Sequence, residues 1–150
     1  MNRSLIGCVS SAAAAALALT GCVSPATDET SFADKAAMTA GAAASEVSTV
    51  GLTTALLKAG RLQRNYGDVT ISASEDALAS VEQTFSAVQP PDEASDAVRA
   101  DLEQLLSDAT DAVAAARIAT RRDDQPAMTR AIVALNTSAK QLEAAEERYG

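Results

Sequence analysis

The chain has 150 residues, enough for one domain, and carries 12 basic against 20 acidic residues, a formal charge of -8. Nucleic-acid binding needs a basic face and usually aromatic side chains for stacking, so the acidic balance and the 3% aromatic content argue against that role. Histidine is absent, which removes the commonest general base and the commonest metal ligand. We therefore expect no enzymatic activity, no cofactor and no bound metal.

The first 21 residues have the layout of a secretory signal. Arg3 supplies a positive start, and an apolar run follows from Leu5 to Leu19. This run is about 15 residues long, whereas a helix that spans a bilayer needs roughly 20 apolar residues. A removed signal is therefore a better interpretation than a permanent transmembrane helix.

The signal ends in Leu19-Thr20-Gly21-Cys22, which resembles the lipobox of bacterial lipoproteins. The resemblance implies cleavage between Gly21 and Cys22, acylation of the Cys22 thiol, and a lipid anchor on the extracytoplasmic face of a cell membrane. An ordinary secretory signal, with Cys22 incidental, is the alternative. Cleavage would remove Cys8 and leave one cysteine, so no internal disulfide is expected. Residues 22–31 are small and polar, which is typical of a flexible tether.

The body of the chain, residues 32–150, shows helical periodicity and no strand alternation. The first helix is predicted over 32–65, with Gly67 just beyond its end and an interruption near Gly51. Its apolar residues fall on two opposite faces. One face carries Val47, Val50 and Leu57, and the other carries Met38, Leu52 and Leu56. An interruption at Gly51 would turn both sets into one core, and the alternative is an exposed patch for a partner or a second copy.

Three further helices follow. Ser72 and Glu75 have the spacing of a capping box and would open the second helix, which ends before Pro90. Asp92 caps the third, and the fourth starts near Asp124 with Pro126 in its first turn. The apolar stripes of these helices recur at spacings of three and four. They comprise Leu78, Val81, Phe85 and Val88; Val98, Leu102, Leu105, Ala109, Val113 and Ala116; and Met128, Ile132, Leu135, Ala139 and Leu142.

Four amphipathic helices with short turns predict an all-α, antiparallel four-helix bundle. The alanine-rich composition, with 35 alanines in the whole chain, favours helix and close packing, so no deep ligand pocket is expected. Carboxylates such as Asp108 and Asp111 fall at helical spacing beside an apolar stripe. We interpret them as part of a solvated face, because the known di-metal bundles also need histidine.

An up-and-down bundle would gather half of the basic residues at the end away from the tether. This basic end comprises Lys58, Arg61, Arg64, Arg117, Arg121 and Arg122. Complementarity to the helix dipoles explains much of the pattern, and a surface for an anionic partner is the alternative. The partners expected are the membrane, through lipid on Cys22, and an anionic cell-wall polymer or an envelope protein.

The sequence thus predicts an envelope lipoprotein whose helical body binds a partner, acts as a scaffold or serves as a spacer. The alternative is a small-ligand receptor or an enzyme with a site between the helices. The pattern does not indicate an oligomeric state.

Overall fold

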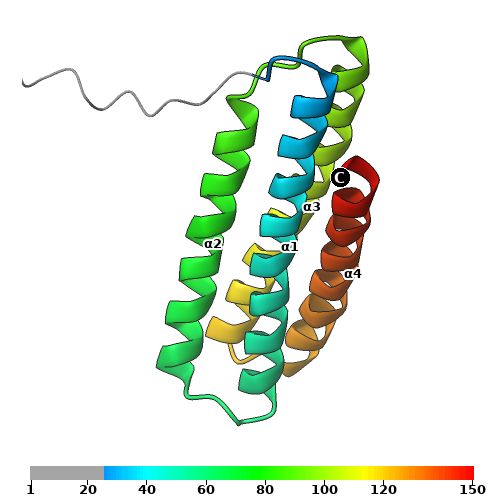
Figure 1. The fold of residues 1–150 in the computed structure, drawn as a ribbon. Coiled ribbons are helices and arrows are strands. Elements are labelled where there is room, and N and C mark those ends of the chain that lie inside the picture. Colours follow the sequence, from blue (N-terminus) through cyan, green and yellow to red (C-terminus); the bar gives the residue numbers. More distant parts are fainter. Residues whose placement is uncertain (1–25) are drawn as a thin grey trace, which may run out of the picture.

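The computed structural model describes residues 26–150, so the signal, the lipobox and most of the tether lie outside the described part. Within it the chain forms four α-helices and no strand: α1 (Glu29–Lys58), α2 (Arg64–Ser86), α3 (Glu93–Arg121) and α4 (Gln125–Tyr149). They alternate in direction along one axis (Figure 1). The predicted all-α, antiparallel four-helix bundle is confirmed.

Helices α1 and α3 each pack against all three other helices, and the contacts of α1 are the more extensive. Helices α2 and α4 lie on opposite sides and do not contact each other. The interface of α1 with α4 is the most extensive. Small residues are buried on both helices, including Ala40, Ala44 and Gly51 on α1 and Ala131 and Ala139 on α4. Gly51 faces Leu135 and Asn136 of α4, and short side chains of this kind let two helix backbones approach closely.

Aspartates cap three of the four helices. Asp28, Asp92 and Asp124 accept hydrogen bonds from backbone amides at 2.8, 2.8 and 2.9 Å, which satisfies donors that the helix itself leaves free. The caps at Asp92 and Asp124 are confirmed. Asp28 starts α1 at Glu29, three residues before the predicted boundary between tether and body.

The predicted boundary between the first two helices is wrong. Helix α1 ends at Lys58, and Gly60 takes the left-handed conformation with φ +66°, which a residue without a Cβ adopts at little cost. Helix α2 then begins at Arg64. Gly67 does not follow a helix end. It lies buried in α2, where a Cβ would come within 2.5 Å of the Leu57 side chain.

Two further sequence expectations fail for related reasons. The Ser72–Glu75 pair lies inside α2 and begins no helix, because the chain is already helical from Arg64. Helix α1 continues through Gly51 without a break, and Gly51 packs there against Leu135 and Asn136 of α4.

The core joins small residues to a few large ones. Helix α3 contributes Leu102, Leu106, Ala109, Val113 and Ala116, all fully buried. The predicted stripe named Leu105, which is only partly buried, in place of Leu106. Leu78 and Phe85 of α2, Val88 just beyond its end, and Met128, Leu135, Ala139 and Leu142 of α4 are buried as predicted. Val81, Val98 and Ile132 are partly buried.

Candidate functional site

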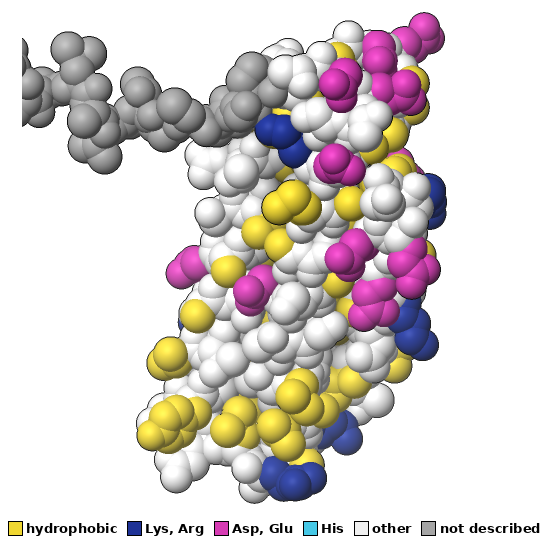
Figure 2. All heavy atoms as spheres, viewed as in Figure 1, with side chains coloured by type: hydrophobic (Ala, Val, Ile, Leu, Met, Phe, Trp, Pro, Cys, Tyr) yellow, Lys and Arg dark blue, Asp and Glu magenta, His cyan; other side chains and the backbone are white. Residues whose placement is uncertain are grey.

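The six residues of the basic end come together at the end of the bundle opposite the entry of the chain. They lie at or near the C-termini of α1 and α3 and the N-terminus of α2. Figure 2 shows basic side chains at the lower end of the visible face and acidic ones toward the upper end and along α4. The predicted separation of charge along the bundle axis is therefore present.

Two of the six cations are held by carboxylates. The Arg64 guanidinium contacts Asp123 at 3.1 Å and donates to the Thr120 carbonyl at 3.0 Å, which ties α2 to the end of α3. Arg117 contacts Glu75 of α2 at 2.8 Å. Asp123 has φ 54°, an uncommon conformation for a residue other than glycine. Neither pairing follows from spacing along one helix, so the sequence did not identify Arg64 and Arg117 as the neutralised cations.

The other four cations are free for a partner. Lys58, Arg61, Arg121 and Arg122 are exposed and form no ion pair within residues 26–150. Glu75 and Asp123 are engaged by other residues, and Asp68 and the exposed Asp124 also lie at this end. Six cations against four carboxylates leave the basic end with a surplus of positive charge, although the whole chain is acidic.

A hollow of about 180 Å³ opens beside Arg64 at the basic end. It is lined by Leu57, Gly60, Leu62, Arg64, Thr120, Asp123 and Met128. The N-terminus of α2 borders it, and Gln63 at the cap position supplies no side-chain hydrogen bond. The hollow therefore combines an apolar floor with an arginine that is already paired.

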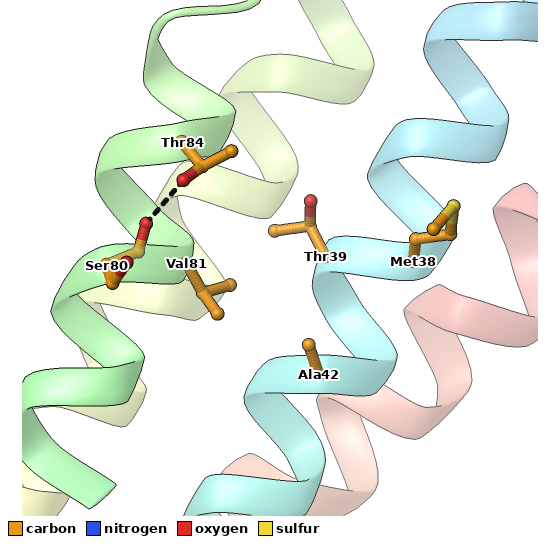
Figure 3. A pocket seen from close by; sticks show the side chains of 6 residues that line it. All are labelled: Met38, Thr39, Ala42, Ser80, Val81 and Thr84. Atoms are coloured by element: carbon orange, nitrogen blue, oxygen red, sulfur yellow. Dashed lines mark hydrogen bonds between the residues drawn. The ribbon is translucent and has the colours of Figure 1, made fainter. Parts of the chain in front are cut away.

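A second hollow, of about 200 Å³, lies between α1 and α2 (Figure 3). Met38, Thr39 and Ala42 line it from α1, and Ser80, Val81 and Thr84 from α2. The Thr84 hydroxyl donates to the Ser80 carbonyl at 2.7 Å. Sites for small ligands usually occupy about 300 Å³ or more, so both hollows are small by that measure.

One long surface across α1 and α2 contains two rows of uncharged residues, although Glu46, half-buried on α1, and Asp76, exposed on α2, lie next to these rows. Its α1 row recurs at intervals of four and three residues, and so does its α2 row. These twelve residues, which we call the charge-free strip, are Met38, Ala42, Ser45, Thr49, Leu52 and Leu56 of α1, and Tyr66, Thr70, Ala73, Ala77, Ser80 and Thr84 of α2. Met38, Leu52 and Tyr66 are 74%, 64% and 63% exposed.

The strip decides between the two interpretations of the first helix. Val47 and Val50 are fully buried, whereas Met38 and Leu52 are exposed on the opposite side. The expectation that both sets form one core is wrong, because α1 does not bend at Gly51. Met38 and Leu52 are instead exposed, and Leu56 is partly buried, on the outer face of α1.

The remaining carboxylates belong to solvated faces and tertiary contacts. Asp108 and Asp111 are exposed, as predicted. Asp101 accepts hydrogen bonds from Arg148 and from the Tyr149 hydroxyl, which fastens the end of α4 to α3. Burial raises the pKa of the Tyr149 phenol, and the Asp101 carboxylate raises it further. Among residues 26–150 no group of acidic, histidine or cysteine side chains could hold a metal, and no helix is long and apolar enough to cross a membrane.

No family model, no curated protein and no solved structure matches this chain. The signal cleavage at Gly21 and the lipidation of Cys22 fall outside the described residues.

Proposed function

We propose that this chain is a lipid-anchored lipoprotein of the bacterial envelope, whose helical body holds its basic end away from the membrane for contact with an anionic partner. The observation that carries the proposal is the placement of the free cations. They lie at the far end of α1, a helix of 30 residues and thus about 45 Å long, from the point where the chain enters it.

The lipobox supports the anchor, and the length of the tether supports the orientation. Six residue steps separate Cys22 from Asp28, the cap of α1, and an extended chain covers about 20 Å over that distance. The end of the bundle nearest the anchor is acidic, with exposed Asp28, Glu29, Asp34, Asp92, Glu93, Asp96, Glu143, Glu146 and Glu147. Repulsion from anionic lipid headgroups would keep this end off the surface.

The partner would carry negative charge accessible from outside the membrane. An anionic cell-wall polymer fits the free cations of the basic end, and so does an acidic patch on an envelope protein. Such contact needs no enclosed pocket. The alternative, a receptor or enzyme with a site between the helices, draws no support from hollows of about 180 and 200 Å³.

The anchor is tested by metabolic labelling with a fatty acid. The wild-type chain should take up the label and sediment with membranes, whereas Cys22→Ala should do neither, since the thiol is the acylated group. Equal labelling of the two proteins would refute the anchor.

The basic end is tested by retention on isolated cell wall at rising salt. Arg121→Glu should elute at lower salt than the wild type, because an attraction between surface charges weakens when one is reversed. Lys140→Glu is the matched control. It reverses another exposed cation without an ion pair among the described residues, but on α4 and outside the basic end. Equal loss of retention in both variants would reduce the effect to net charge and contradict the proposal.

A further inference from the structure

The hollow of about 180 Å³ at the basic end lies where all four helices come together. The helices contribute Leu57 of α1, Arg64 of α2, Thr120 of α3 and Met128 of α4, and the two turns at this end add Gly60, Leu62 and Asp123. The lining thus combines three apolar side chains with three polar ones. It belongs to the end of the bundle as a whole and not to a groove between two helices.

The polar groups of this lining already have partners within the bundle. The Arg64 guanidinium contacts the Asp123 carboxylate at 3.1 Å and donates to the Thr120 carbonyl at 3.0 Å. The Thr120 hydroxyl donates to the Arg117 carbonyl at 3.0 Å. The polar side of the hollow is therefore satisfied without a ligand, and a ligand that is polar throughout would gain little by displacing these contacts.

The apolar side chains of the lining are incompletely covered. Met128 is buried, but Leu57 and Leu62 are only partly buried, so apolar surface beside Met128 stays in contact with water. Removing such surface from water is favourable. A volume of about 180 Å³ is small for a free ligand but sufficient for one large side chain, since an engineered apolar cavity of about 150 Å³ holds a benzene molecule.

The four free cations of the basic end adjoin this hollow. Each is the direct chain neighbour of a lining residue, and consecutive Cα atoms are about 3.8 Å apart. The four pairs are Lys58 with Leu57, Arg61 with Gly60, Arg121 with Thr120, and Arg122 with Asp123. Three of these cations are arginines, whose planar guanidinium groups bind carboxylates through paired hydrogen bonds. A partner that binds the cations would therefore lie over the hollow.

We propose that the hollow receives one large apolar side chain from an acidic segment of an envelope protein, while the surrounding cations bind carboxylates of the same segment. This inference rests on the proposed function of the basic end and narrows the partner to a protein. An anionic polymer of sugar or phosphate units supplies the charge but no large apolar group for the hollow. Protein–protein contacts commonly combine an apolar anchor in a pocket with arginines around it.

The test uses two methionine methyl groups as local probes. Met128 lines the hollow, and Met38, exposed on α1 and outside the basic end, is the internal control. The full-length protein in a neutral detergent, isotopically labelled at the methionine methyl carbons, is titrated with a short peptide of glutamates around one phenylalanine. The ring current of the bound phenylalanine should shift the Met128 resonance, assigned by Met128→Leu, and leave that of Met38 unchanged. The same peptide with alanine for phenylalanine should shift neither resonance. With the phenylalanine peptide bound, no shift at Met128 or an equal shift at Met38 would overturn the proposal.

The affinities of the two peptides, measured by fluorescence anisotropy, give a second test. The phenylalanine peptide should bind about tenfold more tightly or better than the alanine peptide, because only it covers the apolar lining. Leu62→Ser should remove most of this difference and Leu62→Met should retain it; Leu62 lies in no helix, and circular dichroism checks the fold. Leu56→Ser is the matched control, since Leu56 is also partly buried but does not line the hollow. A difference that persists in Leu62→Ser, or that Leu56→Ser removes equally, contradicts the inference.

Failure of the proposed function is read separately. If the two peptides bind equally and Arg121→Glu weakens both, the basic end binds anions but the hollow takes no side chain, and only this inference fails. If a linear polyphosphate of similar charge binds more tightly than the phenylalanine peptide, the partner is a polymer, which also overturns the inference. If neither the peptides nor the polyphosphate bind at low salt, the basic end is not a binding surface and both proposals fail.

Discussion

Gly51→Ala should stabilise this protein, although glycine stands where α1 packs against α4. An ideal Cβ at residue 51 would meet the Leu135 Cβ and the Asn136 Oδ1 at 3.7 Å, which are ordinary van der Waals contacts. The helix interior gains about 0.8–1.0 kcal/mol when alanine replaces glycine, because the unfolded chain loses conformational freedom. The added methyl group is buried and contributes up to about 0.8 kcal/mol more. We expect a gain of about 1–2 kcal/mol.

Gly67→Ala should not stabilise the protein as Gly51→Ala does. Its Cβ would lie 2.5–2.8 Å from three atoms of the Leu57 side chain. The leucine must move within a packed contact, a kind of strain that typically costs about 1–3 kcal/mol. This cost offsets or exceeds the gain in helix propensity, so Gly67→Ala should be neutral to destabilising.

Urea unfolding followed by circular dichroism at the helical band measures both changes against the wild type. The shift in midpoint, at an unchanged slope, gives the change in the free energy of unfolding. A destabilised Gly51→Ala would refute the argument, because it would mean that α1 and α4 leave no space for a methyl group at residue 51. A Gly67→Ala variant more stable than Gly51→Ala would refute it equally.

Three further outcomes follow from the core, the first turn and the end of α4. Leu106→Ala should lower the free energy of unfolding by about 2.7–5 kcal/mol and Leu105→Ala by clearly less, because only Leu106 is fully buried. If urea unfolding shows the larger loss for Leu105→Ala, the assigned core is wrong. Gly60→Ala should cost about 1 kcal/mol, since φ +66° disfavours a Cβ, and a thermal midpoint at or above that of the wild type would count against this turn. Replacing Tyr66 by phenylalanine leaves Tyr149 as the only tyrosine, and its absorbance should titrate with a midpoint above pH 10. Asp101→Asn should lower the midpoint of this titration only in part, because burial is the larger cause of the raised pKa. The folded state favours the protonated phenol, so the contribution of Tyr149 to the stability of the fold is complete below pH 10 and is lost as the pH rises through the pKa of the folded state. A titration midpoint at or below pH 10 would contradict the raised pKa.

Capping residues predicted the start of a helix correctly where the contact involves only the first turn of that helix. Asp92 and Asp124 cap α3 and α4 because an aspartate can reach the amide three residues on, whatever the rest of the fold does. The same kind of signal failed at Ser72, because a serine and a glutamate three residues apart also occur inside helices. The role of Gly67 depends on Leu57 of another helix, a contact that no pattern within α2 reveals.

The sequence also predicted only part of the two candidate surfaces, the basic end and the charge-free strip. The six cations of the basic end were predicted to share one end from chain direction alone, and they do. Arg64 and Arg117 are neutralised by Asp123 and Glu75, which lie more than 40 residues away in the chain, so the number of free cations required the tertiary structure. The charge-free strip was predicted only as one of two alternatives, because its exposure depends on whether α1 bends at Gly51.

The position of α1 has a mechanical consequence. Residues 26–28 lead directly into this helix, which packs against all three others, as α3 does, but with the most extensive contacts. A pull exerted through the tether and resisted at the opposite end would act lengthwise along α1, sliding it against α2, α3 and α4 at once. Many side-chain contacts would then resist the force together, in shear, whereas a tether attached to α2 would load only its contacts with α1 and α3. The chain thus takes up tension at its best-supported helix.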